Sequence, residues 1–264
     1  MMGCVPLYAG TVSQTSNQSA REPHVGNLFS KEYGKLLLED TKHVFTSPAR
    51  WEEKEWSIFG VETLAVVGTA AFLDKPLQKK IQNHRSSTKD DIADIFQPFG
   101  AEYSFAVLGA FELGGVTFKD DRAKAVAQDG LAASLISAGV ITPSLKLAIG
   151  RSRPNKNEGA HHFEPFSSND SFPSGHTTQA FAVASVISEQ YDPLWVKITS
   201  YGVASLVGLA RMEHNAHYAS DVLAGAIIGT AVGRTVVHFN QEKRIQLSVI
   251  VDDDGIELTM AHAF

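Results

Sequence analysis

The stretch Pro173-Ser174-Gly175-His176 stands at the start of a segment, residues 175 to 190, that has the apolar spacing of a helix. Proline and serine are typical of helix starts. Glycine lets backbone N–H groups approach a ligand closely, and free N–H groups at a helix start bind anions. The stretch therefore predicts an anion site at a helix N-terminus, with His176 at its edge. An ordinary helix cap beside a surface histidine is the alternative that this stretch alone leaves open.

The segment Lys146-Leu-Ala-Ile-Gly-Arg-Ser-Arg153-Pro154 closes a helix predicted over residues 121 to 149. Lys146 and Arg153 are seven residues apart, which is two helical turns, so we expect them to share a face. Two such cations could grip an anion, and the planar fork of arginine matches a phosphate. Arg151 competes with Arg153 for this role, and the proline that follows favours Arg153. The alternative is that these basic residues merely complement the helix dipole.

The segment Arg211-Met-Glu-His-Asn-Ala-His217-Tyr-Ala-Ser-Asp221 enters a helix predicted over residues 217 to 239. His217 and Asp221 are four residues apart, so on a helix they face the same way. A carboxylate bound to one imidazole nitrogen fixes the tautomer and leaves the other nitrogen free as a base or nucleophile. Arg211 adds a third cation. A surface ion pair between His217 and Asp221 is the alternative for this segment alone.

The bulk composition excludes several classes of protein. The chain has 264 residues, 44% of them apolar and 20% charged, which is ordinary for a globular protein. The net charge of −6 gives no argument for nucleic-acid binding, so we expect no nucleic-acid partner. Cys4 is the only cysteine, which rules out an intramolecular disulfide. Cys4 is either an ordinary free cysteine in a loose tail or a lipidation site near a truncated start.

Three parts are expected along the chain. A flexible arm, residues 1–28, is polar and lacks a periodic apolar pattern. An all-α domain follows over residues 29–240. In the last part, residues 241–264, the apolar residues alternate from Arg244 to Val251 and from Ile256 to Met260, around a turn signal at Asp254-Gly255. This pattern predicts a short C-terminal β-hairpin.

The helices of the all-α domain are expected over residues 30–43, 51–73, 101–118, 121–149, 175–190, 193–210 and 217–239. In the second of them, Phe59, Leu64, Val67 and Ala71 are the expected core contacts. In the last, Gly225, Gly229 and Gly233 recur at every fourth position, which puts them on one face and predicts close approach of a neighbouring helix.

Hydropathy gives no clear membrane span. The best apolar run is Gly130 to Leu145, 16 residues with Pro143 inside it, whereas a spanning helix needs about 20. We therefore expect helices that pack on each other and not on lipid, with peripheral membrane contact at most. Marginal spans stay open, because functional membrane helices tolerate polar residues that face inward.

Taken together, the three segments resemble the motifs of the type 2 phosphatidic acid phosphatases, a family that shares its fold with the vanadium haloperoxidases. The family pattern is Lys, six residues, Arg-Pro; then Pro-Ser-Gly-His; then Ser-Arg, five residues, His, three residues, Asp. The departure is Ala210, where the family has a serine that is not catalytic. The resemblance covers about residues 100 to 240 and implies the helical bundle of that family. The matching residues are Lys146, Arg153, Pro154, Pro173, Ser174, Gly175, His176, Arg211, His217 and Asp221.

The resemblance implies a role for each matching residue. Lys146, Arg153, Ser174, Gly175 and Arg211 would bind the phosphate oxygens. His217 would attack phosphorus to form a phosphohistidine, and Asp221 would orient it. His176 would protonate the leaving alkoxide and then activate water. The family uses no metal or other cofactor, and vanadate is expected to inhibit as a phosphate mimic.

These expectations describe a metal-independent phosphatase, and two alternatives remain. A vanadium-dependent haloperoxidase would hold vanadate with the same residues, and a membrane or scaffold relative would keep the fold without catalysis. The chain is short for a haloperoxidase, and the complete set of polar residues argues against a non-catalytic relative. Lipid phosphates, prenyl pyrophosphates and small soluble monoesters all fit as substrates, and the oligomeric state is undetermined. By similarity to bacterial relatives, we expect an extracytoplasmic location, periplasmic or membrane-associated.

Overall fold

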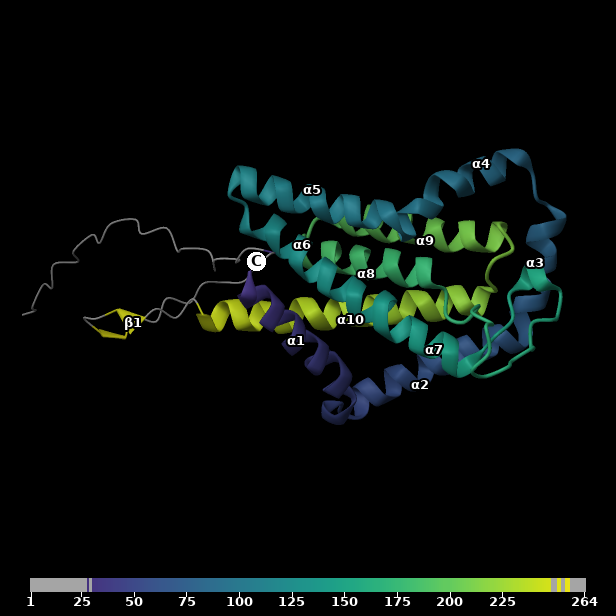
Figure 1. Ribbon diagram of the computed structural model, residues 1–264, viewed down its shortest axis with the longest axis horizontal. Helices are drawn as coiled ribbons and strands as arrows, with labels where there is room; N and C mark the ends of the chain where they lie inside the picture. Colours follow the sequence, from purple (N-terminus) through teal and green to yellow (C-terminus); the bar gives the residue numbers. More distant parts are fainter. Residues whose placement is uncertain (1–27, 29, 248–250, 253–254, 257–264) are drawn as a thin grey trace, which may run out of the picture.

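The computed structural model describes residues 28, 30–247, 251–252 and 255–256, and these residues form an all-α bundle (Figure 1). This confirms the predicted all-α fold. The predicted flexible arm lies almost wholly outside the described residues. The helices are α1 (Lys31–Thr46), α2 (Glu53–Gly68), α3 (Asp74–Asn83), α4 (Ser87–Phe96), α5 (Glu102–Phe118), α6 (Asp121–Ser134), α7 (Thr142–Ile149), α8 (Gly175–Gln190), α9 (Leu194–Glu213) and α10 (Ala219–Leu247).

Short 3₁₀ turns and π-helical segments link several of these helices. The 3₁₀ turns are Ser47–Arg50, Gln97–Gly100 and Pro154–Lys156, and the π-helical segments are Thr69–Leu73 and Leu135–Ile141. Helix starts follow their local sequence: the side chains of Ser30, Ser86 and Asp120 each accept a hydrogen bond from a first-turn N–H group. The charged stretch that follows residue 73, for which no helix is predicted above, forms α3 and α4.

Helix α8 lies at the centre of the bundle, between α6, α9 and α10 (Figure 1). The main hydrophobic cluster joins α8 to α6 and α10, and small or β-branched side chains dominate it, which permits short distances between helix axes. Its fully buried members include Val126, Ile136, Val186, Val236 and Val237. The core therefore fixes the two helices, α8 and α10, whose N-terminal ends carry His176 and Asp221.

The glycine face of α10 packs directly on α8, as the four-residue spacing predicts. A Cβ atom on Gly225 would lie 2.7 Å from the carbonyl oxygen of Ser174, and one on Gly229 would lie 2.8 Å from the amide nitrogen of Ala182. Non-bonded carbon contacts are normally about 3.5 to 4.0 Å. Any side chain larger than hydrogen at these positions would therefore push α10 away from α8.

The apolar face of α2 corrects the sequence interpretation. Phe59, Leu64 and Val67, the expected core contacts, are 48%, 72% and 58% exposed, and Ala71 is exposed as well. Three helical segments are long and apolar enough to cross a membrane: Glu53–Asn83, Asp121–Ile149 and Ala219–Arg244. The expectation of helices without lipid contact rested on uninterrupted apolar runs. It missed these segments because glycine, threonine and a few polar residues interrupt each run without removing its apolar character.

The predicted C-terminal hairpin is not supported. Arg244 to Leu247, which were expected to begin its first strand, continue α10 past residue 240. Within the described residues, only Val251–Asp252 (β1) and Gly255–Ile256 (β2) pair, over two residues each. Arg244 explains the longer helix, because its guanidinium binds the buried Asp129 carboxylate of α6 at 2.7 and 2.9 Å. That ion pair favours helix at the point where the alternating pattern begins.

Replacing Gly229 with alanine should lower the melting temperature of the purified protein, because the new methyl group would separate α8 from α10. Overpacking of this kind costs about 1–3 kcal/mol, more than the roughly 1 kcal/mol that alanine gains over glycine in a helix. Gly202→Ala in α9 is the matched control, since nothing lies within 4 Å of its added Cβ. Thermal unfolding in detergent measures both variants. An equal or higher melting temperature for Gly229→Ala would contradict the close packing.

Candidate active site

The three motif segments meet at one end of the bundle, where α7 and α9 end and α8 and α10 begin (Figure 1). The amide nitrogen of Ser174 donates a 3.0 Å hydrogen bond to the carbonyl oxygen of Asp221, which joins the second segment to the third. A Cβ on Gly175 would lie 4.0 Å from Cε of Lys146, which places the first segment beside the second. Residues far apart in sequence are thus gathered by the ends of the central helices.

Lys146 and Arg153 lie close together, but not on one helical face as predicted. Helix α7 ends at Ile149, and Gly150 follows with φ +59°, in the left-handed region that favours glycine. The chain therefore leaves the helix before Arg153. Both cations instead converge on Asp170, which lies just before the Pro-Ser-Gly-His stretch.

Asp170 is an internal carboxylate partner for these two cations, and the sequence motifs did not point to it. Its carboxylate accepts hydrogen bonds from Nε and Nη2 of Arg153 at 2.7 and 2.6 Å, and its backbone carbonyl accepts one from Nζ of Lys146. Arg153 keeps Nη1 without a partner among the described residues. This fork-to-fork geometry is the one that arginine also makes with phosphate.

Arg211 approaches the same place from the end of α9. Its Nη1 donates to the side-chain oxygen of Gln97, which also accepts from Nδ1 of His214 at 2.9 Å. Nε of Arg211 is buried and has no partner in the described part of the chain. A buried, unpaired donor on a cation is costly unless a ligand completes it. Gln97 was also missed, because it lies more than a hundred residues away and carries no motif.

The Ser174–Gly175 turn forms the start of α8, as predicted. Ser174 is fully buried, and its hydroxyl accepts a 2.9 Å hydrogen bond from the hydroxyl of Thr177. The Ser174 side chain makes no capping hydrogen bond to the first-turn N–H groups of α8. An N-cap side chain usually accepts hydrogen bonds from these N–H groups, and here it does not, so they stay available to a ligand.

His217 is buried, at 3% exposure, and its ring is held by a backbone carbonyl. Nδ1 lies 2.7 Å from the carbonyl oxygen of Ser171, and 3.8 Å from Oδ2 of Asp221. A carbonyl can only accept, so Nδ1 carries the proton and Nε2 keeps its lone pair. The predicted pairing with Asp221 is therefore a near contact, and the direct hydrogen-bond partner is Ser171.

Asp221 lies behind His217, in the first turn of α10. Its Oδ2 accepts hydrogen bonds from the hydroxyl of Ser171 at 2.6 Å and from the amide of Tyr218 at 2.8 Å. His217 precedes the helix, which begins at Ala219, so the two residues do not share a helical face. Asp221 instead holds two residues beside the ring. One is Ser171, whose carbonyl accepts the hydrogen bond from Nδ1 of His217, and the other is Tyr218, which follows His217 in the chain.

The positive charges of the site act on His176. Burial lowers the pKa of His176 to about 4, and Arg211, His217, Arg153 and Lys146 add to this effect in that order. Burial also lowers the pKa of His217, against the opposing effect of Asp221. Both imidazoles are thus neutral near pH 7 in the protein without ligand. An anion bound among these cations would favour the protonated form of His176.

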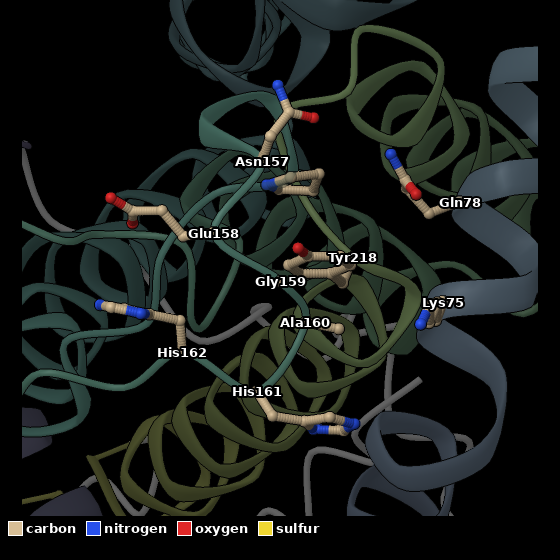
Figure 2. A pocket seen from close by; sticks show the side chains of 10 residues that line it. Lys75, Gln78, Asn157, Glu158, Gly159, Ala160, His161, His162 and Tyr218 are labelled. Atoms are coloured by element: carbon tan, nitrogen blue, oxygen red, sulfur yellow. The ribbon is translucent and has the colours of Figure 1, made fainter.

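Arg151, which competed with Arg153 in the sequence analysis, points away from this cluster. It is 1% exposed and binds Asp74, Asp221 and Ser220. A separate cavity of about 490 Å³ lies next to it, between α3 and the loop that follows Arg153 (Figure 2). His161 and His162, the nearest approach to metal-ligand spacing in the sequence, line this cavity. Among the described residues, no group of three or more His, Cys, Asp or Glu side chains could hold a metal ion.

Comparison with known proteins agrees with the geometry. Residues 130–245 match the profile of the PAP2 superfamily. A lipid A 1-phosphatase of Porphyromonas gingivalis is 36% identical over 112 residues, which are 42% of this chain and 22% of that protein. Lipid phosphate phosphatase 1 of Arabidopsis thaliana is 31% identical over 134 residues, covering 39% of this chain and 41% of that protein. The chain thus spans less than half the length of these curated relatives.

Two solved structures share the fold. The crystal structure of Aquifex aeolicus LpxE aligns with a TM-score of 0.50 and 27% identity, covering 63% of this chain and 95% of that one. A transmembrane PAP2 type phosphatidylglycerolphosphate phosphatase from Bacillus subtilis aligns with a TM-score of 0.51 and 19% identity, covering 81% of this chain and 98% of that one. The profile match, the sequence relatives and the shared fold agree: residues 130–245 of this chain are similar to the PAP2 superfamily.

Proposed function

We propose that this protein is a phosphatase that hydrolyses lipid phosphate monoesters through a phosphohistidine on His217. The observation that carries the proposal is the state of the buried His217 ring. Its Nδ1 proton is bound to a carbonyl, so the unprotonated Nε2 is the nucleophile, in a cluster that also holds Lys146, Arg153 and Arg211. A neutral imidazole of fixed tautomer beside three cations suits attack on a phosphate dianion.

In this mechanism, the cations and the start of α8 hold the phosphate. Nε of Arg211 is buried without a partner in the described part of the chain, and Nη1 of Arg153 makes no hydrogen bond there; both would donate to phosphate oxygens. Lys146, Ser174 and the backbone at Gly175 complete the set. Stabilising charge on the transferring phosphoryl group is the main task in phosphoryl transfer. Three cationic side chains do here what a metal ion does in other phosphatases, so the proposed reaction needs no metal.

The chemical steps use two histidines. Nε2 of His217 forms a bond to phosphorus while the bond from phosphorus to the ester oxygen breaks, and His176 gives its proton to the departing alkoxide. Neutral His176 then takes a proton from water, whose oxygen attacks phosphorus as the bond to His217 breaks. Inorganic phosphate leaves and the enzyme returns to its first state. Asp221 orients His217 through Ser171 and Tyr218 and stabilises the imidazolium character of its ring.

The substrate class follows from the relatives and from the apolar surface. The similar proteins named above are phosphatases of lipid A and of other lipid phosphates. Three segments of this chain could cross a bilayer, and the window in Glu53–Asn83 is wholly unburied within the protein. A membrane enzyme with its phosphate site at one end of the bundle would meet lipid headgroups at the bilayer surface. We place that surface on the extracytoplasmic side.

His217→Ala should abolish hydrolysis, because no other nucleophile occupies its place. Wild-type protein mixed with ³²P-labelled substrate and quenched in alkali should carry an acid-labile ³²P adduct, and the variant should carry none. With ³²P-labelled p-nitrophenyl phosphate, whose leaving group needs no proton, His176→Ala should form the adduct and retain it for longer, because water activation is slowed. His84→Ala, at an exposed histidine just after the end of α3, is the control and should behave as wild type. Hydrolysis by His217→Ala would show that His217 is not the nucleophile.

The rate should fall with rising pH above about 6. kcat/KM depends on protonated His176, whose fraction falls above its pKa of about 4, on dianionic ester, whose fraction rises up to its own pKa of about 6, and on neutral His217, whose pKa is lowered by burial. Above about pH 6 the ester is dianionic, so the loss of the His176 proton lowers the rate by up to about tenfold per pH unit. Steady-state assays with an alkyl phosphate measure this profile. A rate that rises steadily from pH 6 to 8 would contradict the proposed acid.

The role of His176 as acid predicts a dependence on the leaving group. His176→Ala should slow alkyl phosphate hydrolysis by about 10²–10⁴-fold, the usual contribution of acid–base catalysis. The loss should be much smaller with p-nitrophenyl phosphate, because nitrophenolate departs without a proton. Single-turnover rates of both substrates measure the difference. An equal loss for the two would mean that His176 does not protonate the leaving group.

The protein should behave as an integral membrane protein. After expression in bacteria it should stay in the membrane pellet through an alkaline carbonate wash, because three apolar helices hold it there, and detergent should release it. Asn157→Cys should then react with a membrane-impermeant maleimide in intact cells if the site faces outward, with wild type giving the background from Cys4. Release by carbonate alone would support peripheral attachment instead.

A further inference from the structure

Arg151 is the largest fully buried side chain in the described part of the protein, and all of its hydrogen-bond donors are used. Nε and Nη2 donate to the carbonyl of Ala160 at 3.1 and 2.6 Å, and Nη2 also donates to Asp74 at 2.6 Å. Nη1 donates to Ser220 at 2.7 Å and to Oδ1 of Asp221 at 2.5 Å. A guanidinium has five N–H groups, so none is left for a phosphate. Arg151 can therefore act only through its neighbours.

Asp74 holds the far side of this arrangement. It is fully buried at the first residue of α3, and its carboxylate accepts from both the amide and the hydroxyl of Ser220, at 2.8 and 2.5 Å. Ser220 and Asp221 form the first turn of α10, where the helix dipole favours negative charge. Two carboxylates that would repel each other are thus bridged by one arginine and one helix start.

The bridge leads directly to the His217 ring. Arg151 fixes Oδ1 of Asp221, while Oδ2 of the same carboxylate holds the hydroxyl of Ser171 and the amide of Tyr218. The carbonyl oxygen of Ser171 in turn accepts a hydrogen bond from Nδ1–H of His217. If the Asp221 side chain rotated, its hydrogen bonds with Ser171 and Tyr218 would be lost. The carboxylate would then be a buried charge without a partner.

Arg151 also contacts two residues, Tyr218 and Ala160, that line the cavity in Figure 2. Its guanidinium carbon lies 4.4 Å from the centre of the Tyr218 ring, and it binds the carbonyl of Ala160. Figure 2 shows Tyr218 and Ala160 facing the helix that carries Lys75, the residue after Asp74. Arg151 therefore joins three separate segments, α3, the loop at Ala160 and the start of α10, behind the catalytic ring.

We propose that Arg151, held by Asp74, is a positioning residue that fixes the Asp221 carboxylate and thereby the orientation and tautomer of the His217 ring. The inference rests on the proposed function of His217 as the nucleophile. It assigns a role in the reaction to α3, an element that supplies no phosphate ligand. It also separates the two arginines of the first motif: Arg153 faces the phosphate, and Arg151 supports the nucleophile from behind.

The test compares Arg151→Met and Asp74→Asn with Arg153→Met. Rapid quench with ³²P-labelled substrate should show phosphohistidine formation slowed by about 10²-fold in Arg151→Met, the loss expected from a small misplacement of a reacting group. Inhibition by inorganic phosphate should stay close to wild type in this variant, because the phosphate ligands are intact and bound phosphate needs no bond to His217. Arg153→Met should weaken inhibition by phosphate. Equal weakening in Arg151→Met, or an unchanged rate of phosphohistidine formation in the folded variant, would overturn the proposal.

Asp74→Asn keeps the shape of the side chain and protects the test against misfolding. It should lower kcat with little change in KM, and it should add little to the loss in Arg151→Met, because the two residues act through one bridge. Fully additive losses would overturn the shared role. Circular dichroism and the melting temperature identify which variants are folded.

A readout without turnover separates this inference from the proposed function. In ¹⁵N-histidine-labelled protein, the Nδ1–H signal of His217, assigned by its loss in His217→Ala, should be present in wild type and in Arg153→Met. It should shift or broaden in Arg151→Met and Asp74→Asn. If wild type hydrolyses no phosphate ester, the proposed function fails, while this signal still decides whether Arg151 positions the ring. An unchanged signal in both bridge variants would overturn the inference.

Discussion

Mutual repulsion of like charges is the constraint on which the site depends. Lys146, Arg153 and Arg211 gather at one end of the bundle, and two unit charges about 4 Å apart repel by about 4 kcal/mol at an effective dielectric constant of about 20. The fold offsets this with neutral or negative partners: Asp170 between Lys146 and Arg153, and Gln97 on Arg211. Each partner comes from a different segment, so the cations are held apart by the tertiary structure and not by one helix.

The close packing of α8 and α10 makes this arrangement possible. Gly225 lets α10 approach Ser174, and the amide of Ser174 then reaches the carbonyl of Asp221. The start of α8, which is the proposed anion site, and the start of α10, which carries Asp221, are brought together by one glycine face. A property of the helix interface thereby sets the distance between the proposed phosphate ligands and the proposed nucleophile, and stability and proposed activity share the same contacts.

The sequence predicted most of the helices and named the residues of the candidate site, because both predictions depend on local spacing and on short motifs. It could not supply the partners. Asp170, Gln97 and Asp74 carry no motif, and each reaches its cation only through tertiary contact. The helical-face arguments for Lys146 with Arg153 and for His217 with Asp221 were wrong for a local reason. In both cases the helix ends or begins between the two residues, at Gly150 and at Ala219.

Asp170 gives the site a definite state before substrate arrives. Its carboxylate fills the fork of Arg153, which a phosphate would also fill, so a bound phosphate must either displace it or use the remaining Nη1. Displacement would leave Asp170, which is 46% exposed at its side chain, turned to solvent at little cost. Retention would keep Arg153 aligned at the price of a negative charge near the substrate. Burial opposes the charge of Asp170, but the hydrogen bonds and charges of Arg153 and Lys146 outweigh it and lower the pKa of this carboxyl. The carboxylate is therefore charged while it holds the two cations, and it orders them before any ligand binds.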